Sequence, residues 1–108
     1  MPVHHVCTNK NCVGTANGGP WTPRFQSFFD GADLNINTAT EDLVAVAGHR
    51  GPHPAAYHQY VFDRLDGATS GLKANTPEYT RAVKKTLVQI KQEAVTPGSR
   101  VNDWLIGK

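Results

Sequence analysis

A long amphipathic helix is the clearest element that this sequence predicts. Residues 76–78 are Thr-Pro-Glu, which is typical of a helix start, and residues 96–99 are Thr-Pro-Gly-Ser, which is typical of a helix end. Between them, apolar residues recur at intervals of four, four, three and four and so share one face: Tyr79, Val83, Leu87, Ile90 and Ala94. A chain of 108 residues has room for one core. We therefore expect residues 1–108 to form a single domain built against this face.

Shorter patterns predict the elements around that helix. Thr22 and Pro23 mark a second helix start, followed by phenylalanines on one face and ended by Gly31. A third helix runs through residues 54–65, and Ser99 caps a last helical turn. Residues 3–7 and 43–47 read as strands. This order predicts an α+β fold with more helix than strand, and a core that includes Phe25, Phe28, Leu43, Val46, Val83, Leu87 and Ile90.

Composition excludes several classes of protein. No stretch approaches the ~20 apolar residues of a membrane-spanning helix, and the first residues do not resemble a secretory signal peptide. Cys7 and Cys12 are the only cysteines, which excludes a disulfide-rich scaffold. The net charge of +2 is compatible with an anionic partner without identifying one.

Histidine carries the functional signal. The five histidines fall into two groups, His4-His5 near the start and His49, His53 and His58 in the middle. A single histidine in a small domain is more often a surface or core residue than a ligand. Two groups, one of them beside backbone fixed by glycine and proline, favour a metal or acid–base site, because neutral imidazole can bind a metal or accept a proton from water.

The spacing of the histidines suggests different roles within this site. His4 and His5 are adjacent, so in a strand their side chains point to opposite faces and are not expected to bind one metal together. One could bind the metal and the other could act on water. His53 precedes Pro54 at a helix start, where its ring can turn toward the face on which His58 lies. We therefore expect the site to lie where the end of a strand faces the first turns of a helix.

Two alternatives use sulfur. His5, Cys7 and Cys12 could form half of a structural zinc site completed by His53 or His58, although a second cysteine pair is absent. Cys7 could also be a nucleophile paired with a histidine, but no local motif supports this. The simplest interpretation makes Cys7 a buried strand residue and Cys12 a loop thiol.

Three stretches together resemble the AHH family of nucleases. They are HHVCTNKN at 4–11, GGPWTPRF at 18–25 and GHRGPHPAAYH at 48–58. The chain departs from the family pattern at Val3, where alanine is expected, and at Cys7, which is often aliphatic or alanine. The resemblance implies the HNH/endonuclease VII group, a ββα-metal (His-Me finger) core with additional helices, and an origin as the C-terminal toxin domain of a longer secreted bacterial polypeptide.

The resemblance also implies metal-dependent hydrolysis of a phosphodiester bond, with DNA as the substrate. Its motif would make His5 the general base and His4, His53 and His58 ligands of one divalent ion, with Mg²⁺ ranked first and Zn²⁺, Mn²⁺ or Ni²⁺ as alternatives. His49 would bind the metal, hold phosphate or orient a ligand. Arg50 and Lys10 would contact neighbouring phosphates, or they are solvated surface charges. Trp21 and Phe25 are expected to pack rather than to stack on bases.

We therefore expect an HNH-type endonuclease, a DNase that acts as a toxin in the cytoplasm of a target bacterium and is neutralised by a cognate immunity protein. No membrane partner is expected. An RNase on the same scaffold and a non-catalytic, zinc-stabilised binding module remain the alternatives.

Overall fold

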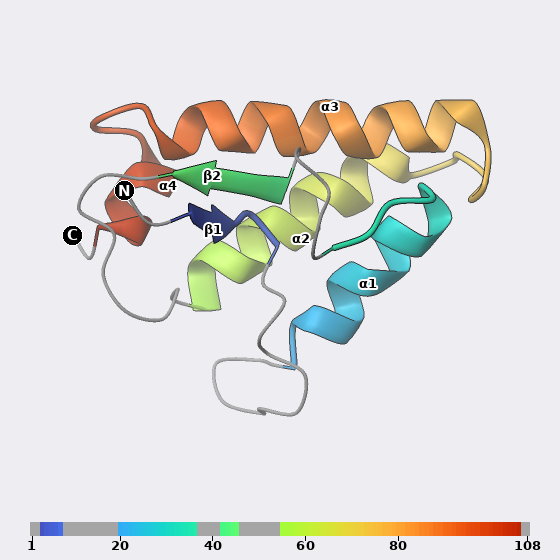
Figure 1. Cartoon of the computed structure of the whole chain (residues 1–108), viewed down its shortest axis with the longest axis horizontal. Coiled ribbons are helices and arrows are strands. Elements are labelled where there is room, and N and C mark those ends of the chain that lie inside the picture. The colour runs from blue at the N-terminus through green and yellow to red at the C-terminus, as the bar shows by residue number, and fades with distance from the viewer. Residues whose placement is uncertain (1–2, 8–19, 37–41, 46–54, 107–108) are drawn as a thin grey trace.

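A computed structural model describes residues 3–7, 20–36, 42–45 and 55–106, with the backbone alone for residues 3–5 and 43–45. Two short strands and four helices follow one another in this part of the chain (Figure 1). They are β1 (Val3–His5), α1 (Thr22–Gly31), β2 (Leu43–Ala45), α2 (Ala55–Thr69), α3 (Pro77–Ala94) and α4 (Arg100–Leu105).

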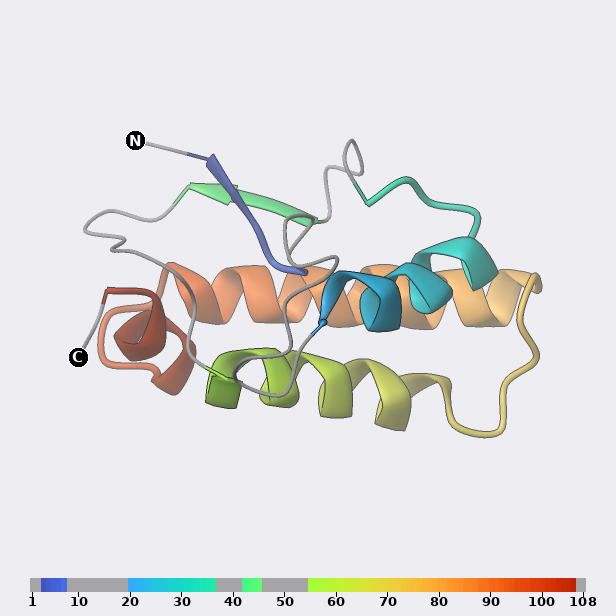
Figure 2. The same ribbon diagram turned by 90° about the horizontal axis from the view of Figure 1, so that it is seen from below.

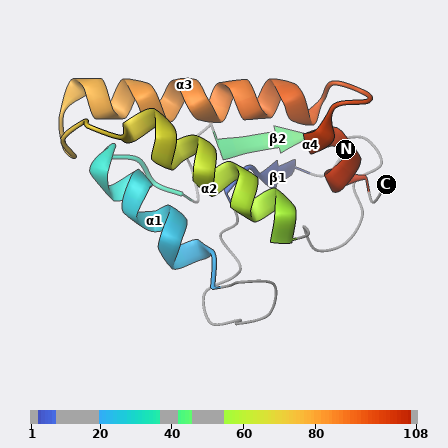
Figure 3. The same ribbon diagram turned by 180° about the vertical axis from the view of Figure 1, so that it is seen from behind.

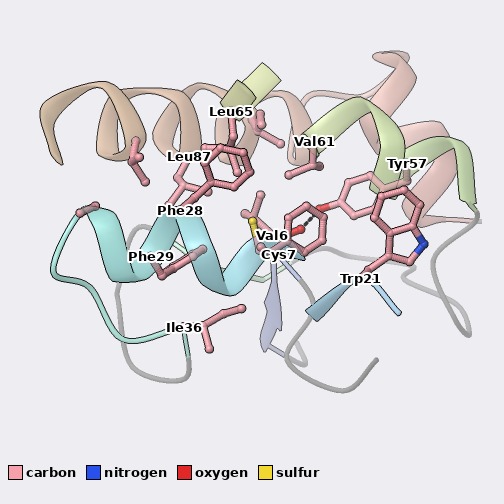
Figure 4. Close-up of a cluster of buried hydrophobic side chains, with 14 of the residues drawn as sticks. Val6, Cys7, Trp21, Phe28, Phe29, Ile36, Tyr57, Val61, Leu65 and Leu87 are labelled. Carbon is pink, nitrogen blue, oxygen red and sulfur yellow. Dashed lines mark hydrogen bonds between the residues drawn. The ribbon is translucent and has the colours of Figure 1, made fainter. Parts of the chain in front are cut away.

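Helix α3 is the centre of the molecule, because it contacts α1, α2, α4 and β2. Seen from below, the two strands and α2 lie at opposite sides of the view with α3 behind them (Figure 2), and from behind α2 runs in front of the strands (Figure 3). The buried apolar side chains between these elements form one core (Figure 4). Its largest fully buried side chains are those of Trp21, Tyr57, Phe25, Phe29, Leu65, Leu87, Ile90 and Leu105.

The start and the buried face of α3 follow the sequence prediction. The Thr76 hydroxyl accepts a hydrogen bond from the backbone N–H of Tyr79 at 3.3 Å, as an N-cap does. All five apolar residues of the predicted stripe are buried. After α3 ends, the Ser99 hydroxyl caps the start of α4 by accepting a hydrogen bond from the backbone N–H of Asn102.

Helix α1 begins differently from the prediction. Trp21, not Thr22, occupies the N-cap, and the Trp21 side chain makes no capping hydrogen bond. The Trp21 side chain is only 1% exposed, so burial of its ring places the helix start, in place of a capping hydroxyl. Gly31 ends the helix as predicted, and a Cβ at this position would lie 2.7 Å from Cε1 of Tyr79. Glycine is therefore required by the close approach of α3.

Helix α2 extends beyond the predicted end at Leu65 to Thr69. Gly67 does not stop it, and the Thr69 hydroxyl donates to the Leu65 carbonyl within the last turn. Of the predicted core, the side chains of Phe25, Phe28, Val83, Leu87 and Ile90 are buried, whereas those of Leu43 and Val46 lie outside the described part.

The expected α+β class is wrong. Helices make up most of the described residues, and the two strands are three residues each. They pair antiparallel, with Val3 opposite Ala45, and form a minimal ribbon on a helical body rather than a β layer. A ββα-metal core is not shown, because residues 46–54, which would join β2 to α2, lie outside the described part, and the described residues contain no metal-binding group. Nor is any described helix long and apolar enough to cross a membrane.

Candidate functional site

The predicted site residues fall into three sets. His4 and His5 lie in β1, opposite Val44 and Leu43, with only their backbone described. His58 lies in the first turn of α2 and is described in full. The others lie outside the described residues: Lys10, Cys12, His49, Arg50 and His53. The structure thus tests the approach of β1 to α2, and the surroundings of one of the expected ligands.

The end of β1 is bonded directly to α2. The hydroxyl of Tyr57, the residue before His58, donates to the backbone carbonyl of Val6 at 2.6 Å (Figure 4). Val6, the residue after His5, is wholly buried, and Tyr57 is 1% exposed. This bond joins residues 51 apart in the sequence and brings the strand that carries His4-His5 beside the first turn of α2. The sequence predicted this meeting of a strand end with a helix start.

His58 occupies an aromatic pocket and is 5% exposed. The Trp21 ring stacks on it with centroids 5.4 Å apart, and the Tyr57 ring presents its edge at 5.6 Å. Phe25 completes the surroundings at 6.3 Å. Burial lowers the pKa of His58 from 6.5 to about 4, so its imidazole is neutral at pH 7.

A neutral imidazole is the form that a metal ligand requires, so His58 fits the expected role chemically. The same burial also fits a core histidine that packs against aromatic rings. Among the described residues, no three or more His, Cys, Asp or Glu side chains come together as a metal site. The rest of the expected ligand set, His4 and His53, involves side chains that the structure does not describe.

Cys7 is a buried residue, as the simplest interpretation of the sequence has it. Its side chain is wholly buried in the core, directly after β1 (Figure 4). Burial, together with the charge of Asp42 and a hydrogen bond to it, raises the pKa of the Cys7 thiol well above its usual value. The thiolate that nucleophilic attack needs is therefore disfavoured. This counts against a role of Cys7 as a nucleophile.

Trp21 and Phe25 pack in the core, as predicted. Both are buried, and their ring centroids are 6.0 Å apart. The Arg24 guanidinium lies over the Trp21 ring at 4.8 Å from its centroid, on the solvent side of α1. Trp21 thus links α1 to His58 and is not available to stack on a nucleic-acid base.

Asp42 is a functional candidate that the sequence did not reveal. It directly precedes β2, yet its side chain is wholly buried and accepts a hydrogen bond at the end of β1. An acid directly before an apolar strand gives no signal of burial by itself. Tyr57 appeared only as a letter of the 48–58 motif, and its hydroxyl bond to Val6 follows from the tertiary structure.

Comparison with known proteins identifies the family. No curated protein and no solved structure matches the chain. One family model does match, over residues 1–93, and its description is a nuclease family of the HNH/ENDO VII superfamily with conserved AHH. The residues at that signature are Val3, His4 and His5, so the chain differs from it only at the first position. The chain belongs to the AHH family of nucleases.

Proposed function

We propose that this nuclease is a metal-dependent endonuclease that hydrolyses DNA without sequence preference. The observation that carries the proposal is the hydrogen bond from Tyr57 to Val6, since it holds the His4-His5 strand beside the helix turn that contains His58. Membership of a nuclease family supplies the reaction class.

His5 accepts the proton of the attacking water in this proposal, and His4, His53 and His58 hold one divalent ion. When bound, such an ion neutralises charge that develops on the scissile phosphate and the leaving oxygen. His58 supports the assignment because its imidazole is neutral at pH 7. His49 orients a ligand or contacts phosphate, while Arg50 and Lys10 bind phosphates on either side of the cleaved bond.

The chemistry of the donors bears on the choice of metal. Imidazole suits Zn²⁺ and Ni²⁺, whereas Mg²⁺ and Mn²⁺ prefer oxygen ligands. With three histidine ligands, Mg²⁺ would depend on oxygens of the substrate and of water. The proposal therefore requires each of the four ions to be tested separately.

The biological role that we propose is that of an antibacterial toxin. The domain would be delivered as part of a larger secreted effector, act in the cytoplasm of the target cell, and be neutralised by an immunity protein in the producer. Expression in the bacterial cytoplasm should then kill and remove nucleoid DNA staining. Healthy growth with a high soluble yield and no immunity protein would contradict the toxin role.

The substrate is tested with the purified 108-residue chain, supercoiled plasmid and total RNA, each with Mg²⁺, Mn²⁺, Zn²⁺, Ni²⁺ or chelator. We expect nicking and linearisation of the plasmid with at least one ion and none with chelator. Cleavage of RNA with intact DNA would establish the RNase alternative. A chain that unfolds on chelation would instead be stabilised by a structural metal.

The histidine roles are tested by two alanine variants. His5→Ala should lower the cleavage rate by a factor on the order of 10² to 10⁴ with little change in metal affinity, as expected for a positioned base. His53→Ala should weaken metal binding, and added metal should restore part of the rate. Calorimetric metal titration beside plasmid nicking separates them. Equal loss of metal by both variants would refute the division of roles.

A further inference from the structure

We infer that Asp42 and Tyr57 are positioning residues of the nuclease reaction, which together fix the end of the His4-His5 strand against α2. This inference rests on the proposed function. It assigns a role to a buried acid and a buried hydroxyl that the proposed chemistry does not use directly.

Asp42 accepts hydrogen bonds from two successive backbone N–H groups at the point where β1 ends. Its carbonyl accepts from the N–H of Val6, and its carboxyl Oδ1 accepts from the N–H of Cys7, both at 2.6 Å. Val6 directly follows His5, whose partner in β2 is Leu43, so the first of these bonds continues the ladder. The second hydrogen bond lies one residue beyond the end of the ladder and is made by a side chain instead of the backbone. Asp42 is wholly buried, and a carboxyl group is costly to bury unless such bonds compensate.

Tyr57 fixes the same point from the helix. Its hydroxyl donates to the carbonyl of Val6, so both backbone polar groups of Val6 are held, the N–H by Asp42 and the C=O by α2. The edge-to-face contact with Trp104, with centroids 6.4 Å apart, restrains the Tyr57 ring.

The two-stranded ribbon of β1 and β2 needs the hydrogen bonds of Asp42 and Tyr57 to keep its position. A pair of three-residue strands is too short to hold its own position. If the end of β1 shifts, His5 moves relative to His58 and so, in the proposed function, relative to the bond to be cleaved. A displacement of about 1 Å can cost ~100-fold in rate. Such a shift would leave α2 in place and would affect the position of His5 most directly. The expected signature is therefore a loss that falls mainly in kcat rather than in KM.

Tyr60 offers a matched control. It lies three residues further along α2, and its hydroxyl donates to Glu93 and accepts from Arg64, each at 2.5 Å. Like Tyr57, it joins two elements through a tyrosine hydroxyl. Unlike those of Tyr57, the hydrogen-bond partners that the structure describes for Tyr60 lie on α2 and α3 and not at the end of β1. Tyr60→Phe should therefore lower the melting temperature without moving the strand.

The experiment compares Tyr57→Phe, Asp42→Asn, Asp42→Ala and Tyr60→Phe in the 108-residue chain, at a temperature where all are folded. Tyr57→Phe should lower kcat on supercoiled plasmid by roughly ten- to a hundredfold and change KM by less than about twofold. Tyr60→Phe should leave both within about twofold. Asp42→Asn retains an acceptor oxygen and should keep more of the rate than Asp42→Ala. Hydrogen exchange gives a readout independent of activity, because the amides of Val6 and Cys7 should exchange faster in Tyr57→Phe and in Asp42→Ala only.

Two results would overturn the positioning role while leaving the nuclease intact. One is a kcat for Tyr57→Phe no lower than that for Tyr60→Phe, and the other is unchanged exchange of the Val6 and Cys7 amides. A wild-type chain inactive on both DNA and RNA with every ion would refute the proposed function itself. The positioning inference would fall with it.

Discussion

His58 should make the metal-free domain lose stability as the pH falls through its titration range. The folded chain holds this imidazole in an aromatic pocket with a pKa of about 4, whereas the unfolded chain protonates it near 6.5. Between these two pH values the unfolded state binds the proton and the folded state does not. The free energy of unfolding therefore decreases as the pH decreases across this window.

The size of this effect follows from the two pKa values. The loss in the free energy of unfolding that His58 causes is close to zero at pH 7, reaches about 2 kcal/mol at pH 5 and approaches about 3 kcal/mol below pH 4. His58→Phe removes the titrating group and keeps a ring beside Trp21. That variant should lack the part of the pH dependence of stability that comes from His58. The other titrating groups are the same in both proteins, so their effect cancels in the comparison.

Urea unfolding in chelator at pH 7, 6 and 5, followed by tryptophan fluorescence, measures the difference directly. We expect the wild type to lose about 2 kcal/mol more than His58→Phe between pH 7 and pH 5. Parallel stability curves for the two proteins would refute the burial of a neutral His58.

Three substitutions test the packing and capping of the helices. Gly31→Ala should destabilise by about 1–3 kcal/mol, because its Cβ would lie 2.7 Å from the Tyr79 ring. Gly67→Ala should instead stabilise the domain by about 0.5–1 kcal/mol, because Gly67 lies within α2 and a Cβ there would have no atom within 4 Å. Chemical denaturation measures the change in the free energy of unfolding for both variants. A change of the same sign in both would contradict the close approach of Tyr79 to Gly31. Ser99→Ala should cost about 1 kcal/mol by the same assay, since its hydroxyl caps α4 at Asn102. No loss there would show that the cap does not hold this helix.

The helices could be predicted because their signals are local. The apolar stripe of α3, its Thr76 cap and the Ser99 cap of α4 each depend on a few neighbouring residues. The start of α1 could not be predicted in the same way, because burial of Trp21 overrides the capping preference of Thr22. The fold class was predicted with too much β structure, since the strands among the described residues are Val3–His5 and Leu43–Ala45, beside four helices.

The site was predicted in outline only. The sequence indicated a strand end near a helix start, and the bond from Tyr57 to Val6 places β1 against α2 in this way. The contacts that hold them there join residues 35 and 51 apart in the chain, so no local pattern reveals them. The burial of Asp42 likewise depends on contacts with residues far away in the sequence. The roles of the histidines stay predictions, because most of their side chains lie outside the described residues.

The small size of the β ribbon also governs how the domain should lose activity. Three-residue strands open at a lower free energy than long helices that share a core, so β1 is the part expected to fray first. Under mild heating or denaturant, the strand with His4 and His5 would detach while α2 and α3 remain helical. Inactivation would then precede the loss of helical circular dichroism, and the two transitions would not coincide. The catalytic competence of such a domain is a local property that the melting temperature of the whole does not report.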